Sequence, residues 1–172
     1  MDEVTRFIDV WEHESRKTVG LLGTLPRDRY DFRPDADGRS VGELAWHLAE
    51  GDAYITYGIE RGQFDLASRP PGIERPRTIE ALAPAFERVH RDAVARVRKL
   101  TPEDLNRTLS FFTLGPLPIR DLLWNQVLLH GIHHRGQLVL MCRLAGGTPT
   151  GVFGPTREQM PLPKPKEATA TA

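Results

Sequence analysis

The sequence predicts an all-α protein, a four-helix bundle with long loops between the helices. Apolar residues recur at the three- and four-residue spacing of amphipathic helices in four stretches, and Pro- and Gly-rich segments separate these stretches. No convincing pair of strands interrupts them. The 172 residues suffice for one domain with a substantial core. We expect the bundle to occupy residues 1–150, and residues 151–172 to form a Pro-rich, partly flexible C-terminal tail.

The first two helices are predicted from their end signals. The first covers about residues 3–25, because Gly23 and Pro26 are typical of the end of a helix. Ser40 begins the second helix, and Glu43 three residues later completes a capping box. The apolar stripe of this second helix includes a histidine.

The third helix is predicted over residues 78–100. Pro84 near its sixth position should kink the helix or delay its start. Residues 101–104 resemble a new helix cap followed by a single short turn. Residues 110–114 are too short to assign, although a brief extended segment fits them.

The fourth helix is predicted over residues 118–145, and Gly146 and Gly147 end it. It is the longest and most hydrophobic of the four, so we expect it to be the most buried. The loops over residues 27–39 and 62–77 are longer than minimal helix hairpins need. They are therefore candidates for the rim of a site at one end of the bundle.

The composition excludes several classes of protein. Net charge is zero and the basic residues are spread along the chain, which argues against a nucleic-acid partner. The N-terminus is too polar for a signal peptide, and no apolar run reaches membrane-spanning length. The single cysteine, Cys142, excludes an internal disulfide framework and suits a reducing compartment. We therefore expect a cytoplasmic protein without nucleic-acid or membrane partners.

Histidines in the fourth helix form the strongest functional pattern. His130 and His134 are one turn apart on an apolar face, about 40° apart around the helix axis, so their rings can converge on one metal ion. A His-Glu-x-x-His protease is excluded, because Gly131 follows the first histidine. A hydrogen-bonded pair of core histidines explains the spacing equally well. His47 is the best third ligand, and Asp52 is a weaker candidate for a carboxylate near it.

The other histidines and the cysteine are not predicted to be metal ligands or catalytic residues. His133 is offset by 100° from His134, so it should support the site indirectly, lie on the surface or form an interface. His13 and His90 lie among charged residues on amphipathic helices, and no function is assigned to them. Cys142 lies in an apolar stretch and should behave as a small hydrophobic residue.

Two motifs in this order carry a family resemblance. They are residues 39–48 (RSVGELAWHL) and residues 130–138 (HGIHHRGQL), supported by residues 30–34 (YDFRP) and 143–147 (RLAGG). Together they resemble the DinB-like (YfiT-like) metalloenzyme family, and the resemblance covers about residues 5–150. It implies a four-helix bundle in which three histidines bind a divalent metal.

Carried over position by position, the resemblance makes His47, His130 and His134 the metal ligands. Family members bind zinc, nickel or other divalent ions, so the resemblance does not fix the metal; we expect a divalent ion, with zinc or nickel as the first candidates. It further implies a thiol-dependent S-transferase or isomerase that uses bacillithiol, mycothiol or glutathione and acts on small electrophiles. It also implies a homodimer. No catalytic side chain is assigned.

Coordination chemistry is consistent with that implication. Three neutral imidazoles leave positions open for water or a thiol, and a bound ion lowers the pKa of either. Arg135, Gln137 and His133 are candidates for supporting the ligands or orienting a substrate or an anionic thiol. Two alternatives remain open: a metal-dependent hydrolase, and a non-catalytic, stress-associated metal-binding bundle.

Overall fold

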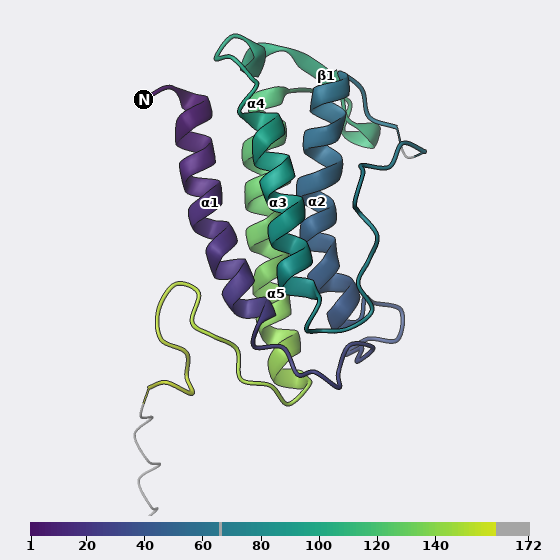
Figure 1. Ribbon diagram of the computed structural model, residues 1–172, viewed down its shortest axis with the longest axis vertical. Coiled ribbons are helices and arrows are strands. Elements are labelled where there is room, and N and C mark those ends of the chain that lie inside the picture. Colours follow the sequence, from purple (N-terminus) through teal and green to yellow (C-terminus); the bar gives the residue numbers. More distant parts are fainter. Residues whose placement is uncertain (66, 161–172) are drawn as a thin grey trace, which may run out of the picture.

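The computed structural model describes residues 1–65 and 67–160. Four main helices lie side by side along its long axis (Figure 1). They are α1 (Glu3–Leu22), α2 (Val41–Arg61), α3 (Leu82–Val97) and α5 (His130–Leu144). The mostly helical, four-helix architecture predicted from the sequence is confirmed.

Local signals explain the ends of α1 and α2. In α1, Asp2 caps the first turn by accepting a hydrogen bond from the backbone of Thr5, and the helix ends before Gly23. In α2, the predicted capping box is present, with Ser40 and Glu43 bonded to each other's backbone amides. These caps satisfy amide groups that have no partner within the helix.

The third helix begins later than predicted. It starts at Leu82 rather than at residue 78, and Pro84 is its third residue. Proline fits the first turn because its missing N–H is not needed there, so the delay expected from Pro84 is confirmed. The short turn expected near residues 101–104 is the 3₁₀ helix η1 (Asp104–Asn106).

A small hairpin corrects the expectation that no strands pair. The antiparallel strands β1 (Thr108–Ser110) and β2 (Pro116–Pro118) flank the 3₁₀ turn η2 (Phe112–Leu114). Figure 1 shows this hairpin at one end of the bundle, and residues 146–160 at the other. Three-residue strands held by a partner strand leave too little periodicity to be recognised in the sequence.

The predicted fourth helix is continuous but not uniform. It consists of α4 (Ile119–Asp121), the π-helical segment η3 (Leu122–Leu129) and α5. The expectation that it is the most buried helix was wrong, because only four of the 15 residues of α5 are buried, against 13 of the 21 residues of α2. The reason is position: α2 packs against α3, α5 and η3, whereas α5 keeps one face exposed.

The chain after α5 folds back on the bundle as far as the structure describes it. Arg143 forms an ion pair with Glu158 at 2.9 Å, and the Lys17 ammonium lies 4.0 Å from the centre of the Phe153 ring. Residues 161–172, the rest of the predicted flexible tail, lie outside the described residues. Among the helices described, none combines the length and apolarity needed to cross a membrane.

Candidate metal centre

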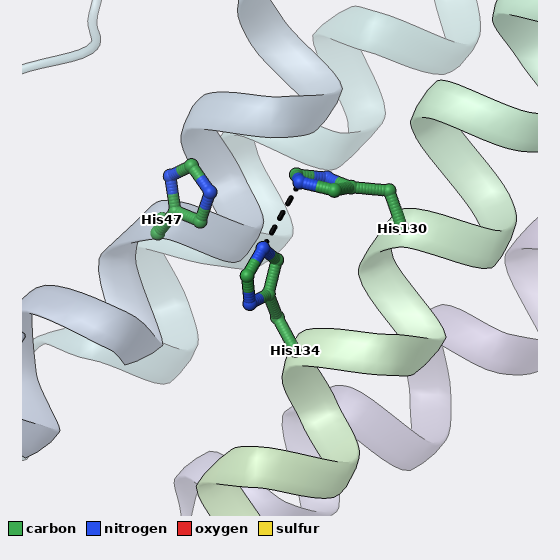
Figure 2. Close-up of side chains that lie close together, drawn as sticks. All are labelled: His47, His130 and His134. Atoms are coloured by element: carbon green, nitrogen blue, oxygen red, sulfur yellow. Dashed lines mark hydrogen bonds between the residues drawn. The ribbon is translucent and has the colours of Figure 1, made fainter.

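Three partly buried histidines from two helices meet between α2 and α5. Figure 2 shows His47 of α2 facing His130 and His134, which lie on successive turns of α5. Each offers one side-chain nitrogen, and these nitrogens all lie within 4.8 Å of one another. The ring centres are 4.4 to 5.4 Å apart. The structure therefore brings together the three side chains singled out in the sequence.

Local sequence explains how the rings can meet. The four-residue spacing of His130 and His134 places both on one face of α5. Gly51, one turn after His47, faces His130, and an added β-carbon there would lie 3.8 Å from the His130 ring. That distance is an ordinary van der Waals contact, and Gly51 itself lines the cavity beside the rings.

Hydrogen bonds orient these rings. The Nδ1 of His134 donates to Oε1 of Gln137 at 2.7 Å, which leaves its Nε2 as an acceptor. That Nε2 lies 2.9 Å from Nε2 of His130. On α2, a carboxylate oxygen of Glu50 lies 3.4 Å from Nδ1 of His47, so Nε2 is the nitrogen of His47 left to bind an ion. Such outer partners commonly orient metal-binding histidines.

The donor set fits a divalent ion. Two nitrogens bound to a tetrahedral zinc ion lie about 3.3 Å apart, close to the observed 2.9 Å between His130 and His134. Zinc and nickel both bind imidazole well, and three neutral ligands leave room for a small molecule. The cluster can therefore hold a metal ion after small adjustments of the rings.

Electrostatics keeps the rings of α5 unprotonated. Burial, followed by the neighbouring rings of His134 and His47, lowers the pKa of His130 to about 4. Burial also lowers the pKa of His134, although its hydrogen bond to Gln137 acts in the opposite direction. The positive charge of the Arg39 guanidinium also lowers the pKa of His130 and of His134. Near neutral pH, both rings are therefore neutral and keep the lone pairs that metal binding requires.

A cavity of about 380 Å³ opens beside His47 and His130. It runs between α2 and the hairpin and is lined by aromatic side chains, namely Tyr54, Tyr57, Phe64, Phe111 and Phe112. This volume falls within the range of small-molecule sites. The aromatic lining was not predicted from the sequence. The adjacent Phe111 and Phe112 in a segment without assigned structure were the available signal.

The three predicted supporting residues have different surroundings. Gln137 contacts His134, as expected for a residue that orients a ligand. His133 is exposed, and its ring centre lies 5.0 Å from that of His134. Arg135 is only 2% exposed and bonds the carboxylate and the backbone oxygen of Glu14 on α1. The structure therefore does not bring Arg135 to the cluster, because one helical step turns its side chain towards α1.

A buried carboxylate and histidine form a second polar pair. Asp52 does not contact His47. Instead, its Oδ2 lies 2.8 Å from Nδ1 of His90, which was assigned no function from the sequence. Burial raises the pKa of Asp52 despite this contact. Cys142 is fully buried, and burial raises the pKa of its thiol, in keeping with the expected hydrophobic role.

Known proteins resemble this chain in sequence and fold. The family model described as the DinB superfamily matches residues 11–138, more than half of the chain. An uncharacterized Bacillus subtilis protein, YrdA, is 28% identical over 156 residues, which cover 89% of each protein.

Two solved structures share the fold. A DinB-like protein from Bacillus cereus superposes with a TM-score of 0.70 and 24% identity, covering 86% of this chain and 95% of that one. A DinB-like protein from Bacillus subtilis, YjoA, gives 0.67 and 24%, with coverage of 83% and 93%.

Proposed function

Since this chain belongs to the DinB superfamily, we propose that it is a metal-dependent enzyme whose ligands are His47, His130 and His134. We propose that it transfers or isomerises small electrophiles with the help of a low-molecular-weight thiol. One observation carries the proposal: the three nitrogens converge on one point, and two of the three histidines, His47 and His130, line a cavity large enough for a small molecule. A purely structural cluster has no need of such a cavity.

The ion and the protein would have different roles in the reaction. When bound, zinc or nickel would lower the pKa of a thiol or of water, so that the anion is available at neutral pH. Gln137 and Glu50 hold His134 and His47 at their Nδ1 atoms. The aromatic side chains of the cavity exclude water from one side of a bound substrate.

The nucleophilic sulfur has to come from outside the protein. The single cysteine, Cys142, is fully buried in α5, and its Sγ lies 3.7 Å from the backbone oxygen of Thr24. A thiol with a raised pKa and no access to the cavity is a poor nucleophile. This favours a small thiol as the second substrate.

Two further expectations remain predictions. The cytoplasmic location is one, and the homodimer is the other. The homodimer is supported by Leu129, Leu140 and Leu144, which are 54 to 57% exposed and follow one another along one side of the fourth helix. Exposed leucines in a row are typical of an association surface.

The proposed function is tested by following thiol consumption with 1-chloro-2,4-dinitrobenzene. Zinc- and nickel-loaded protein is assayed with glutathione, bacillithiol and mycothiol in turn. In the expected reaction, the thiolate sulfur bonds to the ring carbon and chloride leaves. His47→Ala should abolish the acceleration, whereas His13→Ala, at an exposed position of α1, should not.

The alternatives give other results. Thiol-independent hydrolysis of p-nitrophenyl acetate that requires His47 would favour the hydrolase. Full metal loading with neither activity would contradict catalysis on these electrophiles and favour the non-catalytic bundle.

A further inference from the structure

We propose that the cavity beside the histidines binds an elongated amphipathic carboxylate, with its acidic group at Arg39 and its apolar body against Phe64, Phe111 and Phe112. These three phenylalanines are called the aromatic wall below. The inference specifies the substrate class of the proposed enzyme and rests on that function only in placing the reacting group near the histidines.

The rings of the aromatic wall pack against one another. The ring of Phe111 lies edge-on to Phe64 with centres 4.8 Å apart, and Phe112 follows at 5.1 Å from Phe111. Gly58 makes this possible, because a β-carbon there would overlap the Phe64 ring. The wall thus depends on a close approach between the chain after α2 and α2 itself.

Phe112 is held in an unfavourable way. Its φ is +45°, a region that residues with a β-carbon rarely adopt, and the residue is 50% exposed. Backbone strain together with an exposed ring lowers stability, and such features cluster at binding sites. An apolar ligand body would cover this ring and remove its contact with water.

The wall and the histidines lie far apart along one cavity. Both His47 and Gly58 line it, and eleven residues of α2 separate them. At the rise of an α-helix, this separation is about 16 Å. A ligand that reaches from the wall to the histidines must therefore be elongated.

The charges of the cavity favour an acid at the histidine end. Glu50 faces His47, and Asp65 accepts hydrogen bonds from its own turn at Ala67 and Ser68. Arg61 also lines the cavity, but its guanidinium donates to the Tyr57 hydroxyl and helps to lower the pKa of Asp65. In contrast, Arg39 is an exposed residue that lines the cavity without a hydrogen bond or ion pair to any residue within 1–65 or 67–160. A carboxylate would give this guanidinium a charge-assisted partner.

Calorimetric titration with 6-phenylhexanoate and its neutral amide, 6-phenylhexanamide, tests the inference. We expect the acid to bind roughly tenfold more tightly than the amide. Arg39→Gln should remove this preference, whereas Arg91→Gln, at an exposed arginine of α3, should retain it. Phe112→Ala should weaken the binding of both ligands roughly tenfold. Phe153→Ala, which removes an exposed ring outside the cavity, should weaken the binding of neither ligand.

The titrations use metal-free and zinc-loaded protein, and metal content is measured on the same samples. The dependence on Arg39 should appear in both forms, which separates it from carboxylate binding by zinc. If zinc fails to bind while the acid preference persists, the proposed function fails and this inference stands. Equal binding of acid and amide, or equal behaviour of Arg39→Gln and Arg91→Gln, overturns the acidic group. Wild-type affinity in Phe112→Ala overturns the wall.

Discussion

Two groups of buried and partly buried polar side chains occupy the same bundle with opposite surroundings. In the paired region, His90 contacts the carboxylate of Asp52 at 2.8 Å, and its ring packs between Trp11 and Phe86. In the histidine cluster, the rings face one another across α2 and α5. The paired region joins its charged groups to partners within the protein, although Nε2 of His90 is buried without a hydrogen-bond partner among the described residues. The cluster instead directs three donor nitrogens at one point.

The ion pair of Glu14 and Arg135 belongs to the paired region as well. Arg135 is 2% exposed, and Glu14 also binds Lys17 at 2.5 Å. Burial of a charged or titratable group therefore does not itself mark a functional site. What distinguishes the cluster is the convergence of like donors beside a cavity.

Among the substitutions considered, we expect the largest loss of stability when Glu14 loses its charge. Glu14→Gln should lower the free energy of unfolding by about 3 kcal/mol, because it leaves the buried Arg135 without a countercharge. Glu12→Gln removes an exposed pair with Arg98 and should cost less than about 1 kcal/mol. Urea denaturation measures both. Equal losses would mean that Arg135 is not held by Glu14 and would remove the distinction between the two regions.

Histidine replacements should separate the regions in metal-free protein. His90→Ala should cost about 2 kcal/mol, because it opens space beside Trp11 and leaves the Asp52 carboxyl without its partner. His134→Ala should cost less than about 1 kcal/mol, since its ring is only partly buried and its hydrogen-bond partner Gln137 is exposed to water. The same denaturation assay reports both values. A larger loss in His134→Ala would make the cluster a structural element.

A smaller effect is expected on the pH dependence of stability. The folded protein lowers the pKa of His130 to about 4 from the ordinary 6.5, so folding favours the neutral ring. This contribution is complete above pH 6.5 and is lost as the pH falls towards 4. After allowance for solvent screening, we expect about 1 kcal/mol of unfolding free energy to be lost over this window in metal-free protein. His130→Gln should reduce that loss, and an unchanged pH profile would refute the assignment.

Local signals predicted much of the fold. Ser40 and Glu43 specify the start of α2 through contacts three residues apart. The spacing of His130 and His134 follows from helix geometry alone. His47 required more, namely an apolar stripe together with the family resemblance. Features set by neighbours close in the chain were thus accessible to sequence reasoning.

Other features depend on partners distant in sequence. His90 is paired with a residue 38 positions away, and the Phe64 ring meets Phe111 across almost fifty residues. The π-helical segment η3 has the same apolar pattern as an α-helix, so its wider turns left no sequence signal. Arg135 points towards α1 because Glu14 of that helix packs against α5 at this position. These outcomes are decided by tertiary packing.

Whether the three histidines hold a metal ion is decided by metal content per chain, measured by elemental analysis of untagged protein. His130→Ala is measured beside the wild type, and His13→Ala, at an exposed position of α1, is the matched control. We expect about one equivalent of zinc or nickel in the wild type and in His13→Ala, and none in His130→Ala. Absence of metal from the wild type after reconstitution, or full occupancy in His130→Ala, would contradict this expectation.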